Sequence, residues 1–330
     1  MEIAVLDLGS TTFHLQHVRV DANEQFTTTL DTKRTPLLGA RVFIDGFIDR
    51  RSWLESLDAV WELMCASRDA RPSYTAVVAT SAIRAASNGP ALVREIERRH
   101  LVKVRVLDPN DEARLAYLGQ STTPLVGGRR VAVVDLGGGS VEIAVGEGTR
   151  CIHAASLPIG AVRMRAQSRA AVFDRQAASA LALHVREQLD GALRGVRELK
   201  PEVIVFGSGS ARAARKLLTR GTAQPGKTGP IVLADLRCGL DELIGLSSDE
   251  LITLGVEPLR ADTVLVSATI MIQILDSLGA IHVHVSDRGL RDGVALELYR
   301  QELVCGSTSK AIATARWPLG AGPLIVQPRG

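Results

Sequence analysis

The first third of the chain alternates between two apolar periods, which predicts strands and helices in turn. Apolar runs over 2–7 and 12–20 flank the turn Gly9-Ser10-Thr11, as in a β-hairpin. Residues 52–66 have helical apolar spacing, and Ser52 suits the N-cap position of that helix. The next predicted elements are a strand over 74–79, a helix over 90–99, a strand over 102–107 and a helix beginning within 112–118. This order predicts an α/β unit.

The same pattern then restarts. Strands over 131–136 and 141–145 flank the three glycines that follow Leu136. Later predicted elements are a helix over about 174–199, a strand over 202–206, helices near 210–218, 240–254 and 263–278, a strand over 281–286 and a helix over 289–303. Two copies of strand, glycine turn, strand and helix indicate domain duplication, because solenoid repeats recur every ~20–50 residues. We therefore expect two duplicated domains facing each other across a cleft.

Composition narrows the class of protein only slightly. A length of 330 residues suits about two domains of ~150 residues each. The hydrophobic share of 46% and the charged share of 23% are ordinary for a globular protein. A net charge of +3 is too small to indicate nucleic acid or a membrane surface as a partner, and the pI of about 8.8 mildly favours an anionic ligand.

Segments for export or for a membrane are not expected. The N-terminus runs directly into a strand without a basic segment and an apolar core, so no secretion signal is predicted. The apolar run 264–275 is shorter than the ~20 residues that span a bilayer. The four cysteines are scattered without a CxxC pair, which predicts reduced cytosolic thiols rather than a zinc site. A cytoplasmic location follows as an expectation.

Two stretches of similar pattern carry the candidate chemistry. They are DLGSTTFHL, beginning at Asp7, and DLGGGSVEI, beginning at Asp135, 128 residues further on. A tight turn of small residues can direct several backbone N–H groups at one anion, and phosphate is the obvious guest. Hydroxyl groups in the turns add donors, and each aspartate is placed to hold a hydrated Mg²⁺ that bridges phosphate oxygens. The candidate phosphate-binding residues of these loops are Gly9, Ser10, Thr11, Thr12, Gly137, Gly138, Gly139 and Ser140.

Several alternatives were weighed against this interpretation. A single Asp-Leu-Gly is more often an ordinary hairpin turn, but the duplicate with hydroxyls in the same place favours phosphate binding. A nicotinamide site is disfavoured, because neither loop has G-x-G-x-x-G opening a helix. The run 207–210, GSGS, follows a strand and opens a helix, which suits a cleft wall with a helix N-terminus facing phosphate. His282 and His284 alternate on a strand without a third ligand nearby, so plain strand residues are favoured over a metal site.

These motifs give the chain a family resemblance up to about Tyr299. The sequence resembles the exopolyphosphatase and guanosine pentaphosphate phosphohydrolase family, within the superfamily of actin, sugar kinases and heat-shock ATPases. Besides the two loops, matching segments follow in the family's order: ATSAIRAASN, NDEARLAYLG, SLPIGAVRM and VSDRGLRDG. The resemblance implies an α/β fold of two ribonuclease-H-like (actin-like) domains flanking a central cleft.

The resemblance also implies domain boundaries, a substrate class and a cofactor. Domain I would comprise 1–117 plus about 300–316, domain II would comprise 118–299, and 317–330 would form a partly ordered tail. The implied activity is Mg²⁺-dependent hydrolysis of terminal phosphoanhydride bonds in polyphosphate or guanosine pentaphosphate. Homodimers are frequent in the family, so a homodimer is expected.

Residue roles carry over from the matching positions. Glu112 matches the catalytic glutamate, and Glu142 matches the glutamate that ends the second loop and orients water or holds metal, together with Asp7 and Asp135 as metal ligands. Arg84 matches an arginine for which we expect a phosphate contact. Without the resemblance, Glu112 would be read as an acidic first-turn residue and Arg84 as a helix-surface cation. Further basic residues suited to a polyanion channel, each alone also explained as solvated, are Lys33, Arg34, Arg41 and Arg291.

The chain departs from the family pattern inside its motifs. Thr11 replaces the usual asparagine, Val141 replaces a threonine, and Asp108-Pro109 replaces Ser-Gly before the catalytic helix. Proline cannot donate an N–H, so we expect the turn beside that helix to be rebuilt. Three functions therefore stay open: the hydrolase, a kinase of the same superfamily, and a phosphate or alarmone sensor with weak or no catalysis.

Overall fold

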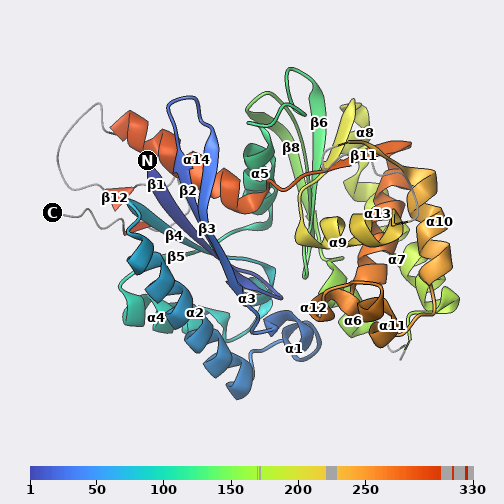
Figure 1. The fold of residues 1–330 in the computed structure, drawn as a ribbon, viewed down its shortest axis with the longest axis horizontal. Coiled ribbons are helices and arrows are strands. Elements are labelled where there is room, and N and C mark those ends of the chain that lie inside the picture. The colour runs from blue at the N-terminus through green and yellow to red at the C-terminus, as the bar shows by residue number, and fades with distance from the viewer. Residues whose placement is uncertain (169, 171, 221–228, 306–313, 316–323, 326–330) are drawn as a thin grey trace. The chain divides into compact units, whose positions relative to one another are not determined.

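The structure is a computed structural model that describes residues 1–168, 170, 172–220, 229–305, 314–315 and 324–325. Its contacts divide the chain into two compact units (Figure 1). Unit 1 comprises Met1–Thr122 with Leu290–Gly330, and unit 2 comprises Thr123–Gly289. The expected tail over 317–330 lies outside the described residues except for Leu324–Ile325.

Unit 1 is built on a five-stranded mixed sheet in the order β3-β2-β1-β4-β5. The strands are β1 (Glu2–Leu8), β2 (Phe13–Val20), β3 (Phe26–Arg34), β4 (Tyr74–Ala79) and β5 (Val104–Val106). The first three pair antiparallel, and β4 and β5 continue in parallel from β1. The helices are α1 (Leu38–Asp45), α2 (Arg50–Ala70), α3 (Ser81–Ala85), α4 (Gly89–His100), α5 (Pro109–Gln120) and α14 (Leu290–Cys305). The central strand β1 is buried on both faces, which explains its continuous apolar run.

Unit 2 repeats this strand order with one strand added. Its sheet has the order β10-β11-β9-β6-β7-β8, in which β6, β7 and β8 are antiparallel and β9 and β11 continue in parallel. The strands are β6 (Arg130–Leu136), β7 (Val141–Glu147), β8 (Arg150–Leu157), β9 (Val203–Phe206), β10 (Ile231–Val232) and β11 (His282–Val285). Helices of this unit are α6 (Ala161–Gln167), α7 (Arg175–Ala192), α8 (Arg194–Glu198), α9 (Gly209–Leu218), α10 (Leu233–Leu243), α11 (Ser248–Thr253), α12 (Pro258–Ala261) and α13 (Val264–Ser277). The predicted duplicated α/β fold is confirmed.

Several predicted elements need correction. The helix expected over about 174–199 is two helices, α7 and α8, that meet at Leu193 between two glycines. The helix expected over 240–254 is likewise split, because Gly245 has φ of 95° and ends α10 before α11 begins. The edge strands β3 and β8 were not predicted. Strand β3 is mostly polar and exposed, and β8 mixes small, polar and apolar residues at half-exposed positions, so neither has the continuous apolar run of the central strands.

The chain returns to unit 1 earlier than the sequence indicated, at Leu290 rather than at about 300. Helix α14 packs against α5 and contributes Leu290, Val294 and Leu298 to the apolar core that holds Ile3 and Val5. Gly293 permits this approach, because a Cβ atom there would lie 1.8 Å from the carbonyl oxygen of Leu115. The last long helix is thus part of the first unit.

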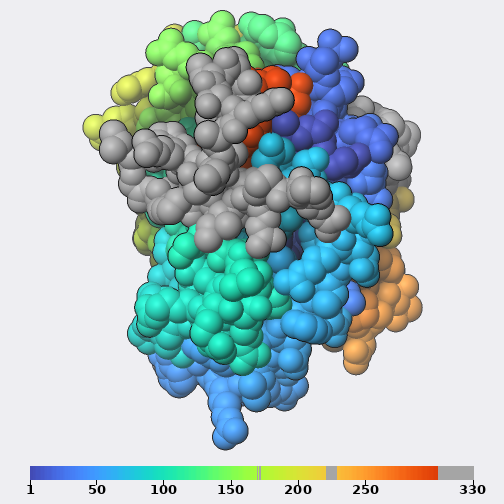
Figure 2. All heavy atoms as spheres, turned by 90° about the vertical axis from the view of Figure 1, so that its left-hand side faces the viewer, coloured from blue at the N-terminus to red at the C-terminus, as the bar shows by residue number. Residues whose placement is uncertain are grey.

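Helices α2 and α4 lie side by side on one face of unit 1, as Figure 2 shows in light blue and blue-green. Trp61 of α2 contacts His100 at the end of α4, with the ring centroids 5.9 Å apart. No helix within the described part of the chain is long and apolar enough to cross a membrane.

Candidate active site

The first glycine turn connects β1 and β2. The Gly9 N–H donates to the carbonyl oxygen of Thr12 at 3.1 Å, and a Cβ atom on Gly9 would lie 2.9 Å from that oxygen. Ser10 is buried, and its carbonyl oxygen accepts from the Gly39 N–H of α1 at 2.7 Å. The turn is therefore tight at its base and is held from outside by α1.

The second glycine turn has the same geometry in unit 2. The Gly137 N–H donates to the carbonyl oxygen of Ser140 at 3.0 Å, the equivalent of the bond in the first turn. In the strand pairing Asp135 stands opposite Glu142, just as Asp7 stands opposite His14. The two loops are thus copies in hydrogen bonding and register as well as in sequence.

Helix α6 supports the second turn. The Arg163 backbone N–H donates to the Gly138 oxygen at 2.9 Å, and its Nε donates to the Gly139 oxygen at 2.8 Å. If the residue just before the helix, Gly160, had a Cβ atom, that atom would lie 2.4 Å from the backbone nitrogen of Ser140. The close contact of two backbones at this point leaves room only for glycine.

Asp7 lies at the end of β1 with one oxygen available. Its Oδ2 is 3.6 Å from the guanidinium of Arg291, while its buried Oδ1 has no hydrogen-bond partner among the described residues. Burial raises the pKa of the Asp7 carboxyl, and the charge of Arg291 opposes this shift. A buried carboxylate oxygen without a partner is costly unless a ligand completes its surroundings.

Asp135 and Glu142 are the corresponding carboxylates of unit 2. Glu142 is 2% exposed, and its Oε1 accepts from the Ser156 hydroxyl at 2.7 Å. A Cβ atom on Gly289 would lie 3.9 Å from Oδ2 of Asp135 and 2.8 Å from the carbonyl oxygen of Gly207. Small residues of neighbouring loops therefore surround the Asp135 carboxylate.

Glu112 lies in the first turns of α5 and forms an ion pair with Arg84. The Nη1 of Arg84 donates to Oε2 of Glu112 at 2.9 Å and to the carbonyl oxygen of Leu107 at 2.6 Å. Glu112 is buried, and its side chain is 9% exposed. The structure thus brings together the two residues for which the family match predicted a base and a phosphate contact. Arg84 already neutralises Glu112 there.

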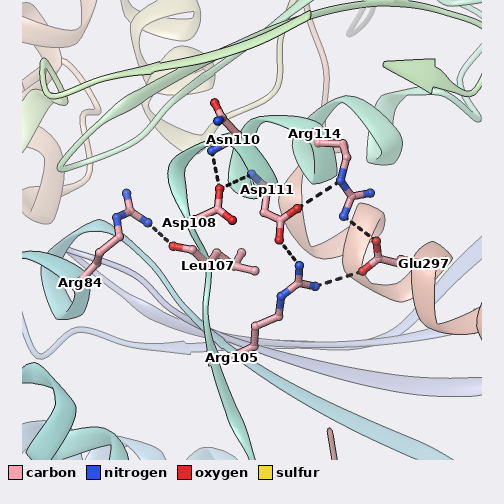
Figure 3. A network of polar contacts seen from close by, with 8 residues as sticks. All are labelled: Arg84, Arg105, Leu107, Asp108, Asn110, Asp111, Arg114 and Glu297. Atoms are coloured by element: carbon pink, nitrogen blue, oxygen red, sulfur yellow. Dashed lines mark hydrogen bonds and ion pairs between the residues drawn. The ribbon is translucent and has the colours of Figure 1, made fainter. Parts of the chain in front are cut away.

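Asp108 and Pro109 replace the Ser-Gly turn of the family by a regular helix N-terminus. Oδ1 of Asp108 accepts from the backbone N–H groups of Asn110 and Asp111 at 2.9 and 3.0 Å (Figure 3). Pro109 occupies the first helical position, where an N–H would have no intrahelical partner. The departure from the family pattern therefore leaves α5 and Glu112 well anchored.

The remaining candidate residues divide between the units. Asp7, Gly9–Thr12, Arg84 and Glu112 lie in unit 1, whereas Asp135, Gly137–Ser140 and Glu142 lie in unit 2. In the run 207–210, Ser208 caps α9 by accepting from the Ala211 N–H at 3.0 Å. A Cβ atom on Gly209 would lie 2.5 Å from the Arg260 guanidinium, so that cation covers the start of α9.

Sequence reasoning missed some of the supporting residues. Gly39, Gly160 and Arg163 hold the loops, and their roles depend on backbone contacts that no motif reveals. Gly160 and Arg163 do lie in the segment SLPIGAVRM, which was noted for its resemblance alone. Arg291, one of the cations suggested for a polyanion channel, is half-buried and lies 3.6 Å from Asp7, a contact that no motif indicated.

Other cations of the expected polyanion channel have partners in unit 1. Arg34 pairs with Glu62, and Arg41 lies 3.8 Å from Asp49. Across the described residues there is no group of three or more His, Cys, Asp or Glu side chains arranged to hold a metal ion. His282 and His284 are accordingly not part of such a group.

Known proteins similar to this chain act on phosphate substrates. "Exopolyphosphatase 1" of Mycobacterium tuberculosis is 27% identical over 309 residues, which cover 90% of this chain and 88% of that protein. "Guanosine-5'-triphosphate,3'-diphosphate pyrophosphatase" of Vibrio cholerae is 27% identical over 340 residues and 94% of this chain. The match spans 62% of the Vibrio protein.

Solved structures share the fold. The crystal structure of an exopolyphosphatase from Cytophaga hutchinsonii matches with a TM-score of 0.82 at 23% identity, covering 91% of this chain and 98% of that one. A Ppx/GppA phosphatase from Aquifex aeolicus matches with a TM-score of 0.71 at 23% identity, covering 90% and 99%. The model of the Ppx/GppA phosphatase family matches residues 18–302. This match covers most of the chain, which carries two copies of the predicted strand, glycine turn and strand, and the chain belongs to the Ppx/GppA phosphatase family.

Proposed function

We propose that this chain releases orthophosphate from the ends of inorganic polyphosphate or from guanosine pentaphosphate, in a Mg²⁺-dependent hydrolysis. The observation that carries the proposal is the pair of equivalent loops, each closed by the same hydrogen bond and each preceded by an aspartate at the same register position. Membership of a phosphatase family with exopolyphosphatase relatives makes the chain a phosphoanhydride hydrolase. The named substrates come from the relatives and are proposals for this chain.

Hydrolysis of a phosphoanhydride needs an aligned water, a base and neutralisation of negative charge. In the proposed reaction a water oxygen bonds to the terminal phosphorus while the bridging P–O bond breaks. Glu112 accepts the proton of that water, and the Arg84 guanidinium, 2.9 Å away, orients its carboxylate. Arg84 binds Glu112 in this structure and so orients the base. We propose that it also contacts a phosphate of the substrate.

The carboxylates present fit Mg²⁺ rather than a metal enclosed by protein ligands. Mg²⁺ keeps several waters and binds through one or two carboxylates plus substrate phosphates. Asp7 offers a buried oxygen that has no hydrogen-bond partner within the described part of the chain, and Asp135 and Glu142 are its proposed counterparts in unit 2. When bound, the ion supplies charge neutralisation for the phosphate oxygens.

The sensor alternative rested on Pro109 and Val141. Val141, a fully buried strand residue, still lacks the hydroxyl donor of a threonine. Pro109, however, occupies the first helical position of α5, where no N–H is needed. This geometry supports the hydrolase. A homodimer and a cytoplasmic location stay predictions.

The test is orthophosphate release by the purified protein with Mg²⁺, offered polyphosphate and guanosine pentaphosphate in parallel. Glu112→Gln keeps the shape of the side chain but removes the base, so we expect release to fall at least ~100-fold, the lower end of the usual range for general bases. Glu302→Gln is the matched control, since Glu302 accepts from the Tyr74 hydroxyl on a distant part of unit 1. The control should keep the full rate.

The faster of the two substrates identifies the branch of the family. Undiminished release by Glu112→Gln would contradict the assigned base. Binding of either substrate without any release by the unaltered protein would favour the sensor instead.

A further inference from the structure

Four charged side chains of unit 1 form a closed ring beside the start of α5 (Figure 3). Arg105 of β5 pairs with Asp111 of α5, and its Nη1 is 3.2 Å from Oε2 of Glu297 on α14. Arg114, one turn beyond Asp111, completes the ring with its Nη2 2.6 Å from Oε1 of Glu297 and its Nε 3.3 Å from Asp111. Positive and negative groups alternate, so every member has two partners of opposite charge.

Two of the four members, Arg105 and Glu297, are largely withdrawn from solvent. The side chains of Arg105 and Glu297 are 7% and 11% exposed. Burial acts to lower the pKa of Arg114, but Glu297 and Asp111 together raise it above its ordinary value. Charged groups buried in this way are held in one arrangement, because losing a partner leaves a charge uncompensated.

The ring includes Asp111, the residue next to the proposed base. Asp111 directly precedes Glu112, and its backbone N–H is bound by the Asp108 cap at 3.0 Å. On its other side Glu112 meets Arg84 at 2.9 Å. The first turn of α5 is thus fixed by its cap, by the ring and by Arg84.

Helix α14 packs closely against α5 and so holds Glu297 in place beside it. It lies against α5 at Gly293, where no side chain could fit between it and the Leu115 carbonyl. One turn further along α14, Glu297 accepts from both arginines of the ring. Near its start the same helix carries Arg291, 3.6 Å from Asp7.

We propose that Glu297 is a positioning residue for Glu112: through Arg105 and Arg114 it fixes Asp111, and so sets where the Glu112 carboxylate lies. Glu297 itself makes no contact with substrate in this proposal. The inference rests on the proposed function, in which Glu112 is the base. It assigns a task to a residue of α14 that no motif singled out.

The test compares Glu297→Gln with Glu24→Gln in orthophosphate release. Each change removes one carboxylate that joins α14 to the rest of unit 1 through arginine. Glu297 on α14 binds Arg105 and Arg114, whereas Glu24 accepts from Arg300 of α14 at 2.6 and 2.7 Å. A small misplacement of a catalytic group costs up to ~100-fold, so we expect kcat of Glu297→Gln to fall ~10–100-fold with KM within about twofold. Glu24→Gln should keep kcat within about twofold. An equal loss in both variants would show a general effect and overturn the inference.

A second comparison separates positioning from a merely structural role. If Glu297 acts through Glu112, adding Glu297→Gln to Glu112→Gln should change the residual rate by less than about twofold, because the two effects are not additive. A further ~10-fold loss in the double variant would overturn the inference. Full activity of Glu112→Gln, or no release by the unaltered protein, would overturn the proposed function and this inference with it.

A variant of a more exposed member of the ring guards against failure to fold. If Glu297→Gln shows no cooperative unfolding, Arg114→Gln takes its place, since the Arg114 side chain is 37% exposed. The same fall in kcat at constant KM is expected. An unchanged kcat for a folded Arg114→Gln would overturn the inference.

Discussion

At the scale of single residues, close backbone contacts determine the shape of the candidate phosphate loops. Gly160 shows this most directly, because the Cβ atom of any other residue would lie 2.4 Å from the Ser140 nitrogen. Neither backbone can move away cheaply, since Arg163 holds the Gly138 and Gly139 carbonyls from the same helix. The position of the second loop therefore depends on a residue outside it.

Gly160→Ala should displace the second loop. We expect a loss of about 1–3 kcal/mol in the free energy of unfolding, as for other overpacked sites, together with a clear loss of phosphate release. Gly191→Ala in α7 is the control, because a Cβ there meets nothing within 4 Å among the described residues. It should stabilise the protein by about 0.5–1 kcal/mol. Denaturant unfolding of both variants decides, and equal stabilities would refute the account of Gly160.

The sequence allowed prediction of the candidate chemical groups but not of their partners. Asp7, Glu112 and Glu142 carry their signal in motifs. By contrast, the Arg84–Glu112 ion pair and the Asp7–Arg291 contact join residues far apart in the chain. Such contacts arise from tertiary packing, which local patterns do not record.

At the scale of elements, the interface between α2 and α4 holds a buried histidine. His100 is 4% exposed, and neither of its ring nitrogens has a hydrogen-bond partner in the part of the chain that the structure describes. Burial lowers the pKa of His100 from its ordinary 6.5, and the charges of Arg68 and Arg99 lower it further. The folded protein therefore keeps this ring neutral at pH values where the unfolded chain protonates it.

This difference predicts how stability depends on pH. As the pH falls below 6.5, the unfolded state binds a proton that the folded state refuses, so His100 makes the folded state less stable on acidification. His100→Leu should remove this contribution and add about 1 kcal/mol at pH 7, because two unsatisfied buried nitrogens are lost. The check is to measure the free energy of unfolding of both proteins between pH 7 and pH 5, a range of ~2 pH units that includes the ordinary pKa of histidine. Parallel pH profiles would contradict it.

Strands that are buried on both faces were predictable, whereas half-exposed edge strands were not. The central strands β1 and β6 have continuous apolar runs because both faces are covered. Edge strand β3 reads FTTTLDTKR, in which most side chains face solvent and no apolar alternation survives. At the start of α5 the family comparison suggested a disturbed turn, but Asp108 and Pro109 form a regular N-cap.

At the scale of the whole molecule, duplication is the feature that links sequence, fold and function. The order β3-β2-β1-β4-β5 recurs as β8-β7-β6-β9-β11, and each copy places one glycine turn between its first two strands. The repeated motif predicted the duplication and the place of each turn, whereas the strand order with its edge strands β3 and β8 came from the structure. The family resemblance implied that the last helix packs back on the first domain, and the structure shows that the whole of α14, from Leu290 on, belongs to that unit and packs against α5.

The most direct measurement of the central claim is orthophosphate release from polyphosphate and guanosine pentaphosphate with Mg²⁺ and after chelation by EDTA. The account predicts steady release with Mg²⁺, loss of nearly all release on chelation, and recovery when Mg²⁺ is restored, since the described residues include no group of three or more His, Cys, Asp or Glu ligands that could retain the ion without phosphate. Release that persists unchanged after chelation, or no release from either substrate with Mg²⁺ present, would contradict it.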